Sequence, residues 1–575
     1  MQIRRALCAL VGGAALVIPI TSAAHAAAPV TAARFSRDIR FTASDGDSLQ
    51  TTVSGSGSPA GRPVVVEFSP YGRASGTFDP GPMYNFLLVQ IRGTGDSDGE
   101  FDALGPRTQS DVVEVLSWAC HQPWSNGILA LNGFSASAIT VYNSMHLHLP
   151  CVRAAILKSG TFDLYRDLLW PGGLSNAVPG LGVLGLIGAP ATTQGASRLQ
   201  RNPASVPGIA TGLLQAGVAA GLQHPTLDSW WRARAFQGRA DPLPILMIDG
   251  FFDVESRGAF QAFQALQGDG AHLMVIGGHD GAPAGTDQGT GEARAWLDHY
   301  LRAVPNGVDH HPAVQLWMSE GDRLGYLAGR FVRVDGSTWP VQGTRWTPLY
   351  LSATRSGTAR SLNDGSLTPA PPATAVTQSY PNVPSDTFMT DPPNTAILGG
   401  DGVNALGTAI PAAEQTNVAE TAALSYTTAP FPRPMTAAGP LDLDVHLSST
   451  AGEAALWAVI SDVWPDGSAH PLTAGRLLND YPNIDPAKSL YDAATGRVVQ
   501  PYGMYDRRSL PAIGATRLYH VEFWPVGNRF DAGHRLRLDL VGPSLASMPG
   551  IPGNNAIVAG GRQGGVLEVP LLPVS

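Results

Sequence analysis

Short apolar runs alternate with a helical pattern between residues 63 and 151, and this alternation restricts the fold more than any other feature. Residues 64–68 and 86–91 are almost continuously apolar, which is typical of parallel strands buried on both faces. Over residues 112–119 the apolar side chains recur every three or four positions, as on the buried face of a helix. Strands that alternate with helices predict an α/β sheet.

The same pattern continues to residue 162, is interrupted, and returns at residue 241. We therefore expect one sheet formed by residues 27–162 and 241–319, with residues 163–240 inserted between its halves. The insertion contains Trp230, Trp231 and Gly-rich apolar segments, and we expect it to form a helical cap. The strands expected in the sheet are 64–68, 86–91, 128–132, 154–157, 245–248 and 273–276, and the helices are 112–119, 136–145 and 292–303.

The periodicity changes beyond residue 320, where apolar and polar residues alternate one by one. Residues 441–447 and 535–540 have this period of two, which is typical of antiparallel strands with one buried face. Residues 361–393 are rich in Pro, Ser and Thr, and we expect a long loop there. The sequence therefore predicts a C-terminal β jelly roll over residues 320–575.

The N-terminus has the three segments of a secretory signal peptide. Arg4 and Arg5 precede an apolar stretch over residues 6–20, and an A-x-A-like cleavage site ends at Ala26. This stretch is shorter than the roughly 18 residues that a membrane-spanning helix needs. We therefore expect a secreted protein, with no stable membrane span once residues 1–26 are removed. The alternative is that this segment stays uncleaved as a membrane anchor.

Composition and spacing exclude several classes of function. The chain has 37 basic and 46 acidic residues and no basic run, so nucleic acid is a poor partner. Residues 92–95, Arg-Gly-Thr-Gly, do not complete a dinucleotide-binding loop. The histidine pairs at 146/148 and 310/311 lack a third ligand at a suitable spacing. We expect no cofactor and no metal, and the sequence does not indicate the oligomeric state.

Ser135 stands between a predicted buried strand and a predicted helix, in the sequence Asn-Gly-Phe-Ser-Ala-Ser-Ala. Small neighbours permit the sharp turn that lifts a nucleophilic hydroxyl above a sheet, and the helix N-terminus supplies backbone N–H groups. The pattern is G-x-S-x-S rather than G-x-S-x-G. The context predicts a nucleophile elbow, and the alternative is an ordinary Ser-rich helix start.

A literal G-x-S-x-G occurs elsewhere, centred on Ser97. Aspartates on both sides of Ser97 would oppose formation of an alkoxide, and no apolar helix follows Gly99. We therefore prefer Ser135 as the nucleophile.

An acid and a histidine follow Ser135 at the ends of later strands, in the chain order of an α/β-hydrolase triad. These residues are Asp253 and His279. The carboxylate can hold the imidazole in one tautomer, and the imidazole can take the serine proton. Rival acids are Asp249, Glu255 and Asp280.

Several motifs occur together along the chain. They are Ser-Pro-Tyr-Gly-Arg at 69–73, Gln-Pro-Trp-Ser-Asn-Gly at 122–127, Gly-Phe-Phe-Asp at 250–253, Trp-Pro-Asp-Gly at 464–467 and Ala-Gly-His-Arg-Leu at 532–536. With them the chain resembles the CocE/NonD family of serine hydrolases, which includes cocaine esterase, α-amino-acid ester hydrolases and X-prolyl dipeptidyl peptidases. The resemblance implies an α/β-hydrolase core followed by a jelly roll.

The resemblance also implies roles for individual residues. The nucleophile would be Ser135, its partners Asp253 and His279, and the oxyanion donors the Tyr71 side chain and the backbone N–H of Ala136. The family usually has Tyr directly after the serine and Gly at the third position after it, where this chain has Ala136 and Ala138. A backbone donor is kept with any side chain, so the difference concerns the shape of the pocket.

Two cysteines remain after removal of the signal peptide. Cys120 ends a predicted helix and Cys151 precedes a predicted strand, so both are expected at the amino edge of the sheet. Export favours oxidation, and we predict a Cys120–Cys151 disulfide.

Together these features predict a secreted serine hydrolase that cleaves a small carboxylic ester, peptide or amide through an acyl-enzyme. An X-prolyl dipeptidyl peptidase is the alternative among enzymes, and it needs an acidic site for a free α-amino group that the sequence does not locate. The alternative of another class is a secreted glycan-binding or cell-wall-binding protein with a decayed hydrolase core.

Overall fold

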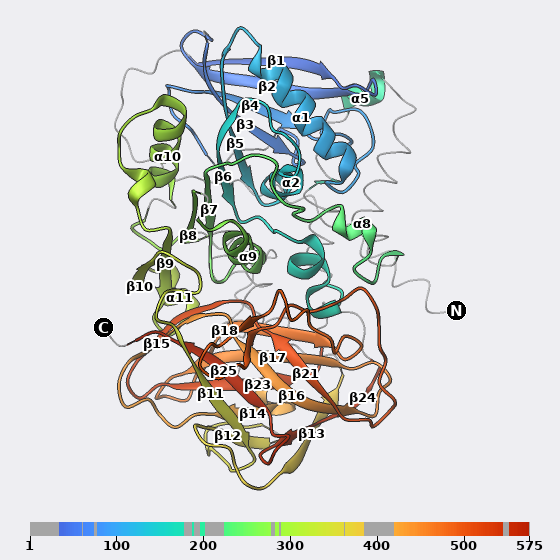
Figure 1. Cartoon of the computed structure of the whole chain (residues 1–575), viewed down its shortest axis with the longest axis vertical. Helices are drawn as coiled ribbons and strands as arrows, with labels where there is room; N and C mark the ends of the chain where they lie inside the picture. The colour runs from blue at the N-terminus through green and yellow to red at the C-terminus, as the bar shows by residue number, and fades with distance from the viewer. Residues whose placement is uncertain are drawn as a thin grey trace.

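The chain folds into an N-terminal region that mixes strands with helices and a C-terminal region built of strands (Figure 1). We call the described residues up to Gly336 the α/β region and those from Arg345 the β region. The predicted signal peptide lies outside the described residues. The computed structural model describes residues 34–59, 61–73, 78–176, 187–188, 196–201, 223–268, 270–277, 282–286, 289–361, 363–383, 419–543 and 551–573.

Parallel strands form the centre of the α/β region, in the spatial order β4, β3, β5, β6, β7, β8 and β9. All the predicted strands are present. Their bounds are β3 Arg62–Ser69, β4 Asn85–Gln90, β5 Ser125–Phe134, β6 Val152–Lys158, β7 Ile245–Asp249, β8 Ala271–Val275 and β9 Val314–Ser319. The predicted α/β sheet is therefore confirmed, and its carboxyl edge is where the loops with Tyr71, Ser135 and Asp253 begin.

Antiparallel strands extend this sheet at both edges. The hairpin of β1 (Arg34–Thr42) and β2 (Ser48–Ser56) joins it through β4, and β10 (Phe331–Gly336) pairs with β9. The sequence pattern did not lead us to predict β1 or β2, and we expected the sheet to end at residue 319. The pairing of β10 extends the sheet beyond that point.

Four longer helices accompany the sheet in the described residues. They are α1 (Pro106–Cys120), α2 (Ala136–Ser144), α9 (Ser256–Leu266) and α10 (Thr290–Arg302). We predicted α1, α2 and α10, but not α9. Buried Phe260, Phe263 and Leu266 line one face of α9 at helical spacing, and this signal was available in the sequence.

The insertion between β6 and β7 consists of short helical segments where it is described. These are η1 (Leu164–Leu169), η2 (Pro171–Gly173), α5 (Ala196–Arg201) and α8 (Ser229–Arg232). Its role as a cap stays a prediction at this point.

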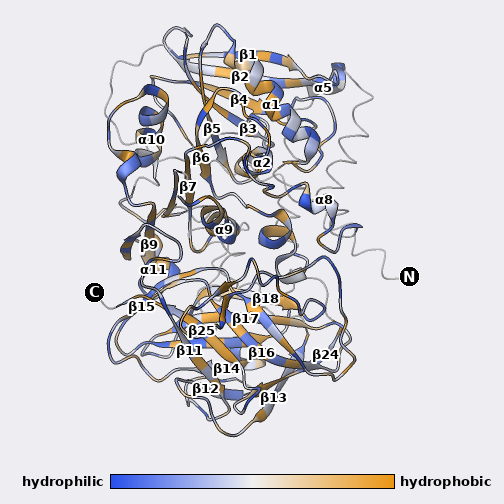
Figure 2. Cartoon of the chain, viewed as in Figure 1, coloured by the Kyte–Doolittle hydropathy of each residue, from blue (hydrophilic) through white to orange (hydrophobic). Residues whose placement is uncertain are grey.

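The β region is made of strands that are mostly antiparallel, and its hydrophobic residues lie along them (Figure 2). The predicted strands at 441–447 and 535–540 are β16 and β23. The predicted loop over 361–393 is wrong where β12 and β13 lie within it, and its residues 384–393 lie outside the described residues. The strands are β11 Arg345–Ser352, β12 Asn363–Thr368, β13 Val376–Asn382, β14 Leu424–Thr427, β15 Met435–Gly439, β16 Asp442–Ser449, β17 Ala455–Val463, β18 Ala469–Leu478, β19 Leu490–Tyr491, β20 Val498–Gln500, β21 Arg517–Glu522, β22 Val526–Phe530, β23 Arg535–Val541, β24 Gly553–Ala559 and β25 Val566–Leu571.

Cys120 and Cys151 form a disulfide in this structure, with their Cα atoms 6.2 Å apart. Cys120 is the last residue of α1, and Cys151 directly precedes β6. The bond therefore ties helix and strand together at the edge of the sheet opposite Ser135. No described helix is long and apolar enough to cross a membrane.

Candidate active site

Ser135 occupies a sharp turn between the end of β5 and the start of α2. Its backbone has φ 53° and ψ −125°, a conformation that residues with a side chain rarely adopt and that costs about 1–3 kcal/mol. Although Ser135 is the residue that caps α2, its hydroxyl makes no capping hydrogen bond. The turn thus holds the side chain out of the helix, as the predicted nucleophile elbow requires.

Small residues make this turn possible. A Cβ at Gly133 would lie 2.5 Å from the backbone nitrogen of Ala138, and a Cβ at Gly160 would lie 2.5 Å from the Ala138 methyl group. The methyl of Ala138, where the resembling family usually has Gly, is therefore accommodated because Gly160 has no side chain. The elbow keeps its geometry in spite of this substitution.

A buried carboxylate, that of Glu67, stabilises the turn at Ser135. Glu67 of β3 is 2% exposed and accepts a hydrogen bond from the Asn132 side chain at 2.8 Å. It also accepts one from the Ser137 hydroxyl at 3.5 Å. Because Asn132 precedes Ser135 and Ser137 follows it, Glu67 fixes the turn from both sides.

The two predicted oxyanion donors lie next to each other. The backbone N–H of Ala136 donates to the Tyr71 hydroxyl at 3.1 Å, and this hydroxyl also hydrogen-bonds the Ser135 side chain. Burial raises the pKa of the Tyr71 phenol to about 12, so it keeps its proton at neutral pH. An oxygen placed between the Tyr71 hydroxyl and the Ala136 N–H can accept from both.

Three acids lie at the end of β7 and in the loop that follows it. Asp249, Asp253 and Glu255 are 0%, 0% and 3% exposed. The Glu255 carboxylate accepts a hydrogen bond from the Ser135 hydroxyl at 3.4 Å, and Asp253 accepts one from the Glu255 backbone N–H at 2.8 Å. Burial, reinforced by the nearby Asp253, raises the pKa of Asp249 well above its usual value.

His279 and Asp280 lie outside the described residues. The first described stretch of the loop after β8 ends at Gly277, whose N–H donates to the Asp249 carbonyl at 2.9 Å. This loop therefore starts beside the end of β7, where the loop that carries Asp253 begins. The structure brings Ser135, Tyr71, Ala136 and the acids together, and it leaves the place of the histidine a prediction.

Known protein families match both regions of the chain. Residues 45–280 match the X-Pro dipeptidyl-peptidase (S15 family), and residues 306–556 match the X-Pro dipeptidyl-peptidase C-terminal non-catalytic domain. Cocaine esterase from Rhodococcus sp. (strain MB1 Bresler) is 24% identical over 457 residues, which cover 72% of this chain and 76% of the esterase. The chain belongs to the CocE/NonD and X-Pro dipeptidyl-peptidase-like family. It is a serine hydrolase.

Solved structures agree with this hydrolase in fold. A CocE/NonD family hydrolase from Staphylococcus aureus has a TM-score of 0.72 at 18% identity, covering 93% of this chain and 94% of that one. An α-amino acid ester hydrolase has a TM-score of 0.70 at 15% identity, covering 97% and 100%. At these identities the likeness supports an α/β-hydrolase fold with a β-rich C-terminal region.

Ser97, the centre of the literal G-x-S-x-G, has a different environment in this hydrolase. It is fully buried, its hydroxyl donates to the Gln90 carbonyl at 2.6 Å, and it accepts from the Gln50 backbone N–H at 2.8 Å. Both hydrogen bonds join neighbouring segments of chain. Ser97 is therefore a structural serine, which agrees with the preference for Ser135.

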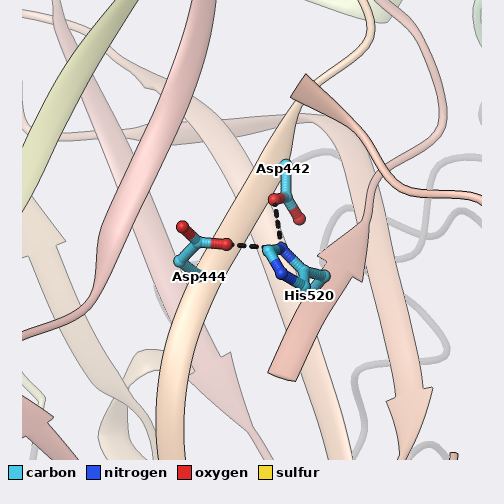
Figure 3. A group of neighbouring side chains, drawn as sticks. All are labelled: Asp442, Asp444 and His520. Carbon is cyan, nitrogen blue, oxygen red and sulfur yellow. Dashed lines mark hydrogen bonds and ion pairs between the residues drawn. The ribbon is translucent and has the colours of Figure 1, made fainter. Parts of the chain in front are cut away.

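A second group of ionisable side chains lies in the β region. Asp442 and Asp444 of β16 both approach the Nδ1 atom of His520 on β21, at 2.9 and 2.5 Å (Figure 3). Burial lowers the pKa of an imidazole, but the hydrogen bonds to both carboxylates outweigh it and raise the pKa of His520 to about 10. The three residues are close enough together to hold a metal ion, and in this structure their side chains contact one another directly. We call this group the His520 cluster.

Two functional features of this hydrolase were missed or misjudged from the sequence. Glu67 is a carboxylate inside an otherwise apolar strand, and that position was itself a signal of a buried structural role. Glu255 was considered only as a rival partner for the histidine, whereas the structure places it against the Ser135 hydroxyl.

Proposed function

We propose that this enzyme cleaves a carboxylic ester or amide through an acyl-enzyme formed on Ser135. His279 takes the proton of the Ser135 hydroxyl as that oxygen attacks the carbonyl carbon, and it returns the proton to the leaving group. Asp253 holds the imidazole in one tautomer and stabilises the imidazolium. Water then attacks the acyl-enzyme with the same histidine as base, which releases the acid and restores Ser135.

The observation that carries this proposal is the arrangement of Tyr71, Ser135 and the Ala136 N–H. Negative charge develops on the carbonyl oxygen during attack, and two donors already in place lower the barrier because they need no reorganisation. The 3.1 Å contact between the Ala136 N–H and the Tyr71 hydroxyl marks where both donors meet beside the nucleophile. The reaction needs no cofactor, since the chain supplies nucleophile, base and donors.

Rapid mixing with a p-nitrophenyl ester tests the acyl-enzyme. We expect a burst of p-nitrophenol close to one equivalent of enzyme, followed by slower steady turnover, because acylation precedes hydrolysis. A linear time course that excess hydroxylamine does not accelerate would contradict an accumulating acyl-enzyme.

The proposal includes export and the finer architecture. Residues 1–26 act as a signal peptide, and the Cys120–Cys151 disulfide suits an oxidising compartment. The insertion forms a helical cap beside the site, supported by the stacking of Phe162 on Phe236 at 4.6 Å, and the β region is a jelly roll. N-terminal sequencing of protein from the culture medium should begin at Ala27, and retention of residues 1–26 would contradict export by cleavage.

Glu255 favours a second candidate, cleavage of substrates with a free α-amino group. A buried carboxylate 3.4 Å from the Ser135 hydroxyl lies where an ammonium group next to the scissile carbonyl can reach it. The sequence alone did not locate such an acid. One relative by fold is an α-amino acid ester hydrolase, and the family models describe X-Pro dipeptidyl peptidases.

Matched esters separate the two candidates. For a substrate that needs its amine, the free α-amino ester should exceed the N-acetyl ester in kcat/KM by at least about tenfold, the scale of one charge-assisted hydrogen bond. Glu255→Gln should remove that preference. Equal rates for both esters in the wild-type enzyme would favour the first candidate, a hydrolase that does not require a free α-amino group.

A further inference from the structure

The loop that carries Asp253 and Glu255 contacts the β region on both of its sides. On the side before Asp253, the Phe251 ring packs against Gly527 of β22. A Cβ at Gly527 would collide with the ring, so only glycine permits this approach. On the other side, Arg257 in the first turn of α9 reaches into the β region.

Arg257 makes a two-pronged ion pair with Glu522, the last residue of β21. Its Nε atom donates to Oε1 at 3.0 Å and its Nη2 atom to Oε2 at 3.1 Å. The Arg257 side chain is only 4% exposed. A planar guanidinium held by two parallel hydrogen bonds has one defined orientation, which an ammonium group could not reproduce.

The remaining Arg257 nitrogen, Nη1, donates to Asp167 of η1. Asp167 is fully buried and also accepts from the Asp163 backbone N–H at 2.7 Å and from the Thr161 hydroxyl. Arg257 therefore joins the acid-bearing loop, the insertion and the β region at one point.

Opposite charges stabilise the contact that Arg257 makes with Glu522 and Asp167. Burial lowers the pKa of a guanidinium, but Glu522 and Asp167 outweigh it and hold the pKa of Arg257 well above its usual value. Removing one member of a buried ion pair is strongly destabilising, because the other charge stays buried without compensation. The three side chains therefore hold one another in place.

Only a few covalent and hydrogen bonds separate Arg257 from the residues of the proposed active site. Arg257 follows Glu255 by two residues, and Glu255 contacts both the Ser135 hydroxyl and, through its N–H, the Asp253 carboxylate. A Cβ at Gly258 would lie 2.6 Å from the Cα atom of Thr161, so the start of α9 is pressed against the chain after β6. A shift of Arg257 must shift this helix start and the acids next to it.

We propose that Arg257, anchored by Glu522 of the β region, is a positioning residue that keeps Asp253 and Glu255 aligned with Ser135. The β region thus contributes to catalysis through this anchor. This inference rests on the proposed function, since it assumes that Asp253 and Ser135 act in catalysis.

Glu522→Gln tests the anchor, with Glu568→Gln as the matched control. Glu568 of β25 is also a buried glutamate paired with an arginine, Arg497 at 2.7 Å, but that pair lies within the β region. Because a misplacement of about 1 Å can reduce a rate about 100-fold, we expect Glu522→Gln to lower kcat about 10- to 100-fold with KM changed less than about threefold. Glu568→Gln should lower thermal stability and leave kcat within about twofold of wild type.

The pH profile distinguishes positioning from a general loss of stability. An Asp253 that is misaligned stabilises the imidazolium less, so the acidic limb of kcat/KM should move to lower pH in Glu522→Gln and stay in place in Glu568→Gln. Glu522→Asp keeps the charge but shortens the side chain, and it supplies the same comparison where Glu522→Gln does not fold. For Glu522→Asp we expect the acidic limb of kcat/KM to move in the same direction, by a smaller amount than in Glu522→Gln.

A double-mutant cycle completes the test. If Arg257 acts through Glu522, Arg257→Gln combined with Glu522→Gln should lower kcat no more than the worse single variant. Unchanged kcat and pH profile in folded Glu522 variants, or additive losses in the cycle, would overturn the inference. Failure of the proposed function is distinguishable, because it would appear as a wild-type enzyme that does not react with a fluorophosphonate.

Discussion

The cluster around Ser135 and the His520 cluster both bury acids, but they differ in how those acids are balanced. In the His520 cluster the two acids Asp442 and Asp444 share one basic partner, His520, and their hydrogen bonds raise the pKa of its imidazole to about 10. Around Ser135 the backbone is strained, the hydroxyl contacts an acid, and burial raises the pKa of Asp249 well above its usual value. The first arrangement stabilises the fold, whereas the second holds strain at the proposed nucleophile.

Burial of charged residues is therefore not by itself a sign of chemistry. What distinguishes the proposed active site is a serine on a strained turn, with hydrogen-bond donors that converge beside it. We expect substitutions in the cluster around Ser135 to lower activity, and substitutions in the His520 cluster to lower stability.

Ser135→Ala should have the largest effect. Without the nucleophile only the oxyanion donors and substrate binding remain, so kcat should fall by about 10⁴- to 10⁶-fold with little change in thermal stability. Ser97→Ala is the control, because it removes two buried hydrogen bonds and should lower stability by about 1–3 kcal/mol with kcat within a few-fold of wild type. Near wild-type turnover by Ser135→Ala would refute the assignment of the nucleophile.

Tyr71→Phe should lower kcat about 100- to 1000-fold, equivalent to about 3–4 kcal/mol, with KM little changed. The ring stays in place and only the donor is lost. Tyr84→Phe is the matched control, since Tyr84 is a buried phenol of the same region that donates to Asp298 at 2.5 Å, away from the elbow. If both variants keep kcat within a few-fold of wild type, the Tyr71 hydroxyl is not an oxyanion donor and the side chain has only a packing role.

Loss of the Cys120–Cys151 disulfide should reduce stability by about 3–4 kcal/mol, because the bond closes a loop with a sequence separation of 31 residues. Turnover should change little, since the bond lies at the opposite edge of the sheet. Thermal unfolding of Cys120→Ser with Cys151→Ser measures this. Two alkylatable thiols in non-reduced wild-type protein would show that the bond does not form.

The His520 cluster should affect stability alone, and in a defined pH range. The pKa of His520 is about 10 in the fold, against an ordinary value near 6.5, so its stabilising effect is complete below pH 6.5 and is lost as pH rises to 10. His520→Gln should therefore be less stable than wild type by about 1.5–3 kcal/mol at pH 6, with the gap closing by pH 10.

His446→Gln is the control for this measurement, because His446 lies on the same strand as Asp442 and Asp444. A constant gap between wild type and His520→Gln over this range would contradict a buried imidazolium. Loss of turnover in His520→Gln at pH 7 would show that the His520 cluster affects catalysis as well as stability.

The sequence predicted the sheet and the elbow well because continuous apolar runs and the position of a serine between strand and helix are local patterns. It failed at β1, whose alternation of Phe35, Ile39 and Phe41 with polar residues was overlooked. It also failed at β12 and β13, where Pro, Ser and Thr suggested a loop. Strand partners supplied from far along the chain, such as β24 for β13, override that local preference.

The support of the site could not be predicted from spacing. Glu67 and Ser137 are 70 positions apart in sequence, and Arg257 and Glu522 are 265 apart, so only the fold brings them together. The tolerance of Ala138 likewise depends on Gly160, whose lack of a side chain matters only once β6 lies beside α2. Local patterns locate reactive residues, and tertiary contacts decide what holds them.

The most direct test of the account is to find which residue reacts with a fluorophosphonate. Native enzyme should take up one label per chain, and mass spectrometry of its peptides should place that label on Ser135, because only an activated serine attacks phosphorus. Heat-denatured enzyme should not react. A label on Ser97, or no label on native protein that is shown to be folded, would contradict the claim that the strained elbow makes Ser135 the nucleophile.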